Sequence, residues 1–560
     1  MTTLHPDLIL TGGKVLTVDA DFTIAQAVAI QGDRICAVGT TADLLALATP
    51  NTRIVDVAGK TVVPGLIDGH AHLDREGLRS VFPSLGKVRS IADVQAALAR
   101  LVARTPKGEW IVTMPLGDPP AYAEVERQLA EGRFPTRHDL DAVAPDHPVY
   151  IRAIWGYWRH TMPLVSVANT KALELAGIGP DTPSPSDLVT IDKDDQGIPT
   201  GVFREQTLMP IVELAFFNEP TRFTRESRAQ ALPRSVQAYH ACGTTSVFEG
   251  HGVASELMQA YRTAHADGQL RMRATLAVSP NWASVPDVAF DTFIEAWCGW
   301  LSGQGMGDDF LRIAGFFVDI GPDVNNVIRA RAYPDTGWAG FNYDTARTRE
   351  RAIELLAACA KHRIQVTAIW PNMLELFYEV HQQVPLNGLR WVFSHISVLN
   401  AQQIEMIREM ELIVTTHTNR YVFKEGHQLR AGLGDARADE IVPLRALVDA
   451  GVPVVLASDN VPVSLFHPFW HAVARMGRDS AEPIAPGQAL TREQALRAVT
   501  RDAALLTWDE ARKGSIEVGK FADLAVLDRD VLLCPAGELS GTTSVLTIVG
   551  GDITHQTTDF

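Results

Sequence analysis

An apolar run that ends in two histidines sets the strictest limit on how this chain can fold. Residues 62–69 read VVPGLIDG, and His70 and His72 follow directly. Side chains alternate along a β-strand, so both imidazoles project from one face of the strand end, with Ala71 on the other. Two neutral imidazoles on one rigid strand end can ligate one divalent metal ion. We therefore favour a metal site over two surface histidines on a loop.

Length and charge narrow the class of protein. The chain has 560 residues, enough for a large catalytic domain and a smaller one. The formal net charge of -16 argues against nucleic acid or an anionic membrane as a partner. The five cysteines form no Cys-x-x-Cys pair, so no disulfide framework or cysteine zinc site is indicated. Because the sequence displays no signal peptide or bilayer-spanning run, we expect a cytoplasmic protein that acts on a small molecule.

Both ends of the chain have the pattern of a small β-domain. Residues 7–63 contain short apolar segments separated by tight turns, and residues 514–528 and 544–551 repeat this pattern. Domain termini often lie close together. We predict that residues 1–63 and 508–560 complete one composite β-sandwich, with a larger domain inserted between them.

The middle of the chain alternates strands with helices. From residue 225 onward there are seven apolar strand-like segments, several of them separated by helical patterns such as 345–361. With the histidine strand the count is eight, which predicts an α/β fold, a (β/α)8 TIM barrel over residues 64–507. The region of about 80–225 is rich in proline and aromatic residues, and we interpret it as a lid-like insertion.

Polar residues stand where the predicted strands end, which is the catalytic face of this fold. Asp459 ends the last strand, and the last strand of a closed barrel neighbours the first. Asp459 is therefore expected to meet His70 and His72 around one ion, and to move a proton from a metal-bound water to a leaving group. His395, at the end of the sixth strand, is expected to bind the metal or a substrate oxygen. Weaker candidates at strand ends are Glu249, Asp319 and His417.

Together these motifs resemble the amidohydrolase superfamily, in its YtcJ-like, N-substituted formamide deformylase-like branch. The resemblance covers nearly the whole chain. It implies a metal-bearing (β/α)8 barrel, a composite β-sandwich and hydrolysis of carbon–nitrogen bonds by metal-activated water. Besides the histidine strand and Asp459, the segments that carry it are 140–149, 169–178, 201–205 (GVFRE) and 513–524 (KGSIEVGKFADL).

The chain departs from many relatives at positions that would bind a second metal. The fourth predicted strand, 315–319, lacks the lysine that bridges two metals in those relatives, and Thr367 replaces the histidine of the fifth strand. The remaining candidate ligands suit one metal. They are His70, His72 and Asp459, with His395 joining them. Zinc is our first choice, and iron and manganese are alternatives, since three protein ligands plus water are normal for catalytic zinc.

The first functional hypothesis is a mononuclear amidohydrolase acting on a non-peptide carbon–nitrogen bond. Asp459 would move the proton and His395 would stabilise the oxyanion. The aromatic residues Trp155, Tyr157, Trp158 and Trp370 suggest an apolar or aromatic substrate, although they would serve equally to pack the insertion. Two alternatives stay open: a metal-dependent decarboxylase or lyase, and a metal-free binding protein. A homodimer is expected from the resemblance alone. Candidates for contact with substrate or for support of the ligands are Glu249, His417, Thr367, Trp370 and Trp155.

Overall fold

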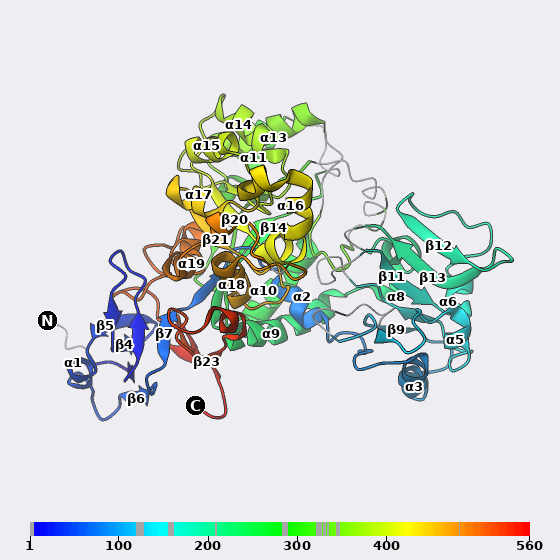
Figure 1. Ribbon diagram of the computed structural model, residues 1–560, viewed down its shortest axis with the longest axis horizontal. Coiled ribbons are helices and arrows are strands. Elements are labelled where there is room, and N and C mark those ends of the chain that lie inside the picture. Colours follow the sequence, from blue (N-terminus) through cyan, green and yellow to red (C-terminus); the bar gives the residue numbers. More distant parts are fainter. Residues whose placement is uncertain are drawn as a thin grey trace. The chain divides into compact units, whose positions relative to one another are not determined.

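The chain divides into two compact units (Figure 1). The first comprises Met1–Glu76, Leu232–Gly321 and Tyr343–Phe560, and the second comprises Gly77–Ala231 and Pro322–Asn342. The computed structural model describes residues 5–118, 122, 128–154, 162–207, 210–282, 289–320, 328, 332, 335–342, 348–480 and 482–560.

Parallel strands of the first unit form the predicted barrel. Within the described residues, the sheet order runs through eight neighbouring parallel strands, and the short β16 (Met306–Gly307) joins β17 antiparallel outside this path. The Asp459 N–H donates to the His70 carbonyl at 3.1 Å, so the chain after the last strand meets the chain after the first. The (β/α)8 architecture is thereby confirmed. The eight strands are β8 (Leu66–Asp68), β14 (Thr244–Val253), β15 (Arg273–Val278), β17 (Leu311–Phe317), β18 (Val366–Ala368), β19 (Val392–Phe393), β20 (Ile413–Thr416) and β21 (Val454–Leu456).

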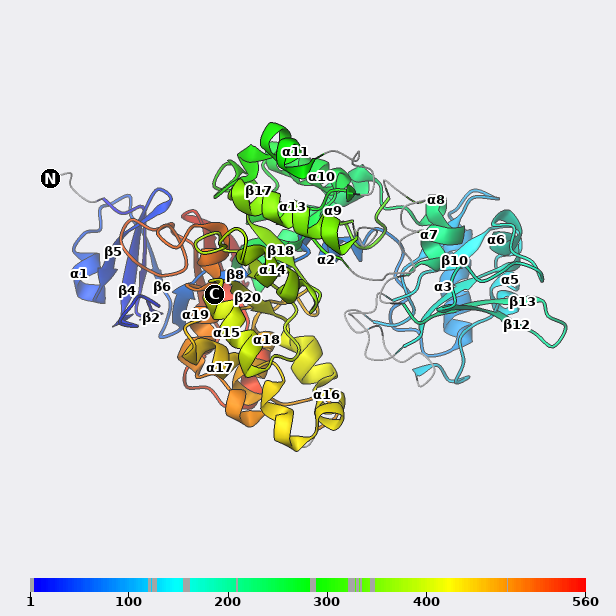
Figure 2. The same ribbon diagram turned by 90° about the horizontal axis from the view of Figure 1, so that it is seen from above.

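Helices between and after these strands cover the barrel from outside, and Figure 2 shows several of them around β17, β18 and β20. Polar caps start some of them, as at Asn400, which accepts from the Gln403 N–H while the Gln403 side chain accepts from the Asn400 N–H in return. Apolar side chains of most of these helices join one large core with the strands. The helices are α9 (Arg225–Ala241), α10 (Ser255–Ala266), α11 (Phe290–Trp297), α13 (Arg349–Lys361), α14 (Met373–His381), α15 (Ala401–Glu409), α16 (Gly426–Leu433), α17 (Leu444–Asp449), α18 (Phe466–Ala474) and α19 (Arg492–Ala498). No helix among the described residues is long and apolar enough to cross a membrane.

Strands from both chain ends pair in one sheet, as predicted. β7 (Thr61–Pro64) runs antiparallel to β22 (Leu524–Leu527), and Val62 lies opposite Val526. Apolar side chains of this sheet pack against those of a second sheet in a common core, which makes the composite β-sandwich. The other strands of the first sheet are β2 (Lys14–Leu16), β3 (Ile24–Ala25), β23 (Ser544–Val549) and β24 (Asp552–Gln556), and those of the second are β1 (Leu8–Thr11), β4 (Ala27–Gln31), β5 (Arg34–Gly39) and β6 (Arg53–Asp56).

The predicted insertion contains a sheet of its own. Five strands pair in the order β12-β13-β11-β10-β9, and they bury apolar side chains in two clusters within the second unit. These strands were not evident from the sequence, because each has only three to seven residues and the region is rich in proline. The elements are β9 (Ile111–Thr113), β10 (Val149–Ile151), β11 (Leu164–Ala168), β12 (Val189–Lys193), β13 (Pro199–Glu205), α3 (Ile91–Val102), α5 (Arg137–Asp141), α6 (Thr170–Leu175), α7 (Val212–Phe216) and α8 (Asn218–Thr221).

A buried ion pair ties the barrel to the sandwich and predicts a stability effect. Arg273 on β15 donates from Nε and Nη2 to the two carboxylate oxygens of Asp523, at 2.6 and 3.0 Å. We expect Asp523→Ala to destabilise the first unit by about 3–5 kcal/mol, because the guanidinium stays buried without its partner. Thermal unfolding should begin at a clearly lower temperature. Asp449→Ala, which removes the exposed partner of Arg445, should change stability by no more than about 0.5 kcal/mol. Equal unfolding midpoints for the two variants would contradict this expectation.

Candidate metal centre

Four buried side chains converge at the carboxyl end of the barrel. One ligand atom from each of His70, His72, His251 and Asp459 lies within 4.8 Å of the others. The His251 Nδ1 is 2.8 Å from the His70 Nε2 and 2.9 Å from the His72 Nε2, which is 3.2 Å from the Asp459 Oδ1. Ligand atoms about 2.1 Å from a tetrahedral metal are about 3.4 Å apart, so these spacings are close to those around a single ion.

A second group shares Asp459 with the first. His395, His417 and Asp459 also bring ligand atoms within 4.8 Å of one another. The His417 Nδ1 is 3.2 Å from the Asp459 Oδ2, whereas the Oδ1 is the oxygen nearer His72. The His395 Nε2 is 3.3 Å from the His70 Nε2. The two oxygens of one carboxylate therefore face different histidines.

Burial keeps the imidazoles in the form that binds metal. Loss of solvation lowers the pKa of His70 to about 3, and the buried guanidinium of Arg75 acts in the same direction. Burial likewise lowers the pKa of His72, His251, His395 and His417 well below the usual value. Neutral imidazoles offer lone pairs, so the donor set of these clustered histidines and one carboxyl fits a divalent metal.

Asp68 clamps the two strand ends that carry the ligands. Its Oδ1 accepts from the backbone N–H groups of Ser458 and His70, at 3.0 and 3.2 Å, and the Ser458 hydroxyl donates to its Oδ2. The two bonds from Ser458 join the strand that carries His70 to the residue before Asp459. The third bond fixes the backbone of His70 to the same carboxylate. His70 and Asp459 are thereby held in a fixed position relative to each other.

Asn460 holds the backbone of His72. Its Oδ1 accepts from the His72 N–H at 2.9 Å, and its Nδ2 donates to the His72 carbonyl at 2.7 Å. The Tyr239 hydroxyl donates to the same Oδ1 at 2.8 Å. Asp459 and Asn460 both have left-handed backbone, with φ of 48° and 63°, which is uncommon outside glycine. The bonds to Asn460 hold this conformation, which aims Asp459 at the histidines.

Glu249 lies behind His72, on the side away from the converging nitrogens. Its Oε2 is 3.7 Å from the His72 Nδ1, while its Oε1 accepts from the Leu73 N–H and the Tyr261 hydroxyl. Burial raises the pKa of Glu249 to about 8. Its position suits an outer partner that orients the His72 ring.

The structure brings together most of the site residues that the sequence predicts. His70, His72, His395, His417 and Asp459 meet in the two groups described above. Thr367 is in β18, and Trp370 follows that strand. The predicted aromatic residues Trp155, Tyr157 and Trp158 lie outside the described residues.

His251 is the ligand candidate that sequence reasoning missed. The predicted second strand stopped at Glu249, but β14 continues to Val253 and is buried along its whole length. Glu249 and His251 are two residues apart, so simple alternation along a longer strand would have placed His251 on the same face. Asn460 and Tyr239 gave no comparable signal, because their role depends on contacts between distant segments.

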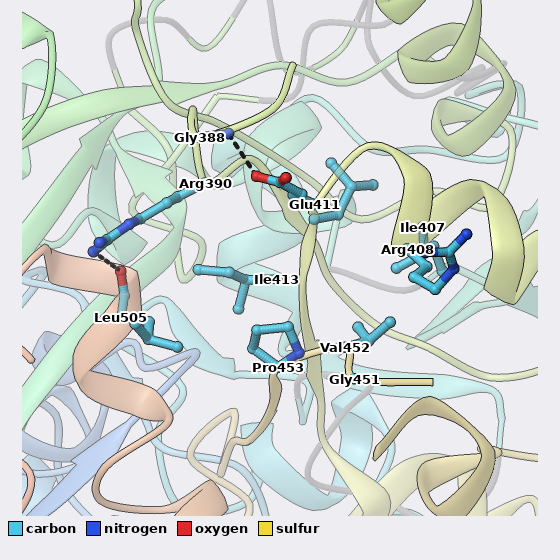
Figure 3. A pocket seen from close by; sticks show the side chains of 11 residues that line it. Gly388, Arg390, Ile407, Arg408, Glu411, Ile413, Gly451, Val452, Pro453 and Leu505 are labelled. Carbon is cyan, nitrogen blue, oxygen red and sulfur yellow. Dashed lines mark hydrogen bonds between the residues drawn. The ribbon is translucent and has the colours of Figure 1, made fainter. Parts of the chain in front are cut away.

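A pocket of about 380 Å³ lies at the opposite end of the barrel. It is lined by residues that precede β19, β20 and β21, such as Arg390, Leu412 and Pro453. Figure 3 shows its polar groups already engaged: Arg390 donates to the Leu505 carbonyl, and Glu411 accepts from the Gly388 N–H. Because chemistry in this fold occurs at the carboxyl ends of the strands, we do not assign this pocket to catalysis.

The fold and the histidine–aspartate cluster define a class of protein, and comparison with known proteins identifies the family. Residues 53–555 match the model of the amidohydrolase family, and the chain belongs to that family. Residues 27–48 also match an imidazolonepropionase-like composite domain of bacteria. The family and the enzyme class expected from the sequence, a metal-dependent hydrolase, are confirmed.

Individual relatives cover nearly the whole chain. An N-substituted formamide deformylase from Arthrobacter pascens is 29% identical, with 99% of each chain covered. The putative amidohydrolase YtcJ from Bacillus subtilis is 23% identical, with 91% of each covered. Among solved structures, an uncharacterized metal-dependent hydrolase from Pyrococcus horikoshii matches with a TM-score of 0.67 and 22% identity, over 95% of this chain and 99% of that one. This last likeness supports the fold alone.

Proposed function

We propose that the protein is a mononuclear zinc amidohydrolase that cleaves a non-peptide amide bond of a small apolar or aromatic substrate. The observation that carries this proposal is the convergence of four buried ligand atoms, from His70, His72, His251 and Asp459, at the carboxyl end of the barrel. Iron or manganese would suit the same ligands. A cytoplasmic location and a homodimer stay predictions.

The bound metal would act as a Lewis acid that makes a water nucleophilic near neutral pH. Side chains of the protein then transfer the proton. We assign the Asp459 Oδ2 to take a proton from the attacking water and deliver it to the nitrogen that leaves as the carbon–nitrogen bond breaks. His417, with its Nδ1 3.2 Å from this oxygen, would orient the carboxylate. His395 would donate a hydrogen bond to the carbonyl oxygen as negative charge develops there.

The substrate class is inferred from the relatives and the surroundings of the cluster. The relative from Arthrobacter pascens is named for N-substituted formamides, so these compounds are the first to test. Phe317 supplies aromatic surface near the cluster, and its ring lies 5.5 Å from that of His251. An aromatic N-substituent would bury well against such a ring.

The test is hydrolysis of a panel of N-substituted formamides and aromatic amides by the protein as purified, after chelation, and after zinc is restored. We expect equal amounts of amine and carboxylic acid from the zinc-loaded protein, and at least about a 100-fold lower rate after chelation. Amine release that persists without metal would contradict the proposed mechanism. Release of carbon dioxide in place of amine would favour the decarboxylase alternative.

A further inference from the structure

Three buried polar groups near the histidine cluster lack hydrogen bonds of ordinary geometry. They are both carboxylate oxygens of Asp319, the Thr367 hydroxyl and the Trp370 indole nitrogen. The donors near Asp319 are the N–H groups of Ile320 and Trp370 and the Trp370 indole. More than about nine in ten buried polar atoms in proteins are satisfied, so three such groups together indicate a site that a ligand or water completes.

Strand register puts these groups on the wall of the catalytic end. Phe317 on β17 is paired in register with Thr367 on β18, and paired residues of adjacent strands point to the same face. The Phe317 ring contacts the ring of His251, so this face is the one that carries the ligand cluster. The Val318 N–H donates to the Thr367 carbonyl at 3.1 Å, which extends the pairing beyond β17. Asp319, two residues after Phe317, therefore lies on the same side.

Among the described residues, no basic side chain is paired with Asp319. Its side chain is 2% exposed, and burial raises its pKa well above the usual value. Within the part of the chain that the structure describes, the groups that oppose this shift are N–H donors of Ile320 and Trp370. A buried carboxylate without a counter-charge is unfavourable, and a bound cation would remove this cost.

We propose that Asp319, Thr367 and Trp370 form a substrate subsite for a protonated basic nitrogen, such as an amine or amidine group. The Asp319 carboxylate accepts the N–H bonds of the cation, and the Thr367 hydroxyl accepts a further one. The Trp370 indole N–H holds the carboxylate, and its ring offers a face to the cation. The inference rests on the proposed function and deepens it, because it makes the substrate an amide that carries a basic group.

Comparing the affinities of two aromatic probes of similar size distinguishes recognition of charge from recognition of shape. We would measure by calorimetry the binding of benzamidine, which is protonated at neutral pH, and of neutral benzyl alcohol to the full-length, zinc-loaded protein. We expect benzamidine to bind the wild type at least about tenfold more tightly, a difference of about 1.4 kcal/mol. Asp319→Asn should abolish this preference and leave the affinity for benzyl alcohol unchanged. Asp435→Asn, at an exposed carboxylate paired with Arg430, should keep the preference.

Two results would overturn the subsite: no preference for benzamidine in the wild type, or a preference that persists in Asp319→Asn. If Asp319→Asn does not fold, Trp370→Phe retains a ring and removes the N–H, and the preference should fall at least about threefold; an unchanged preference would again overturn the subsite. Metal content is measured on each sample. A wild type that holds no metal contradicts the proposed function alone, because the amidinium does not ligate metal and its preference can still be measured.

Discussion

Asp459→Asn is expected to lower kcat/KM by about 10³-fold or more for the amide that the wild type hydrolyses. The asparagine keeps the shape of the side chain but cannot accept the proton of the attacking water or pass it to the leaving nitrogen. It also weakens the ligand set, because a neutral amide oxygen replaces the carboxylate oxygen 3.2 Å from the His72 Nε2. Steady-state kinetics with metal content measured on the same samples separates the two effects.

Asp435→Asn is the matched control for this variant. It makes the same chemical change at an exposed carboxylate, and we expect wild-type kinetics. An Asp459→Asn protein that retains more than about a tenth of wild-type kcat/KM would contradict the assigned proton transfer. A metal-loaded variant with low kcat would instead support it.

His251→Ala is expected to lower metal affinity by at least about 100-fold and to abolish hydrolysis. The His251 Nδ1 lies within 2.9 Å of nitrogens of both His70 and His72. Its loss therefore removes the proposed ligand that lies next to two others. Removal of outer partners alone costs about 10–100-fold in metal affinity, and a direct ligand should cost more. Competition with a zinc chelator measures the effect.

His265→Ala serves as the control, because His265 pairs with Asp308 on the outside of the barrel. It should bind metal as the wild type does. If His251→Ala retains wild-type metal affinity, then His251 is not a ligand and the set consists of other residues. His395 and His417 would then be the next histidines to replace.

The sequence predicted the parts of the site that local pattern determines. His70 and His72 follow an apolar strand at alternating positions, and Asp459 follows another, so closure of the barrel was enough to predict that they meet. His251 was missed because the predicted strand stopped two residues early, which is the ordinary uncertainty of an element boundary.

Contacts between distant segments could not be predicted in this way. Asn460 accepts a hydrogen bond from the backbone of His72, which is 388 residues away in the chain. No sequence pattern around Asn460 predicts this contact. The sheet of the insertion was obscured for a different reason. Its strands are short and separated by proline-rich segments, so periodicity in the sequence was too brief to separate strand from loop.

The position of the metal is the most direct test of this account. Crystals of the zinc-loaded protein would be measured on both sides of the zinc absorption edge. We predict one anomalous peak about 2.0–2.2 Å from the His70 Nε2, the His72 Nε2, the His251 Nδ1 and the Asp459 Oδ1. Two peaks would contradict the mononuclear site. A zinc-loaded crystal with no peak among these four residues would contradict the central claim, that this cluster is the metal centre.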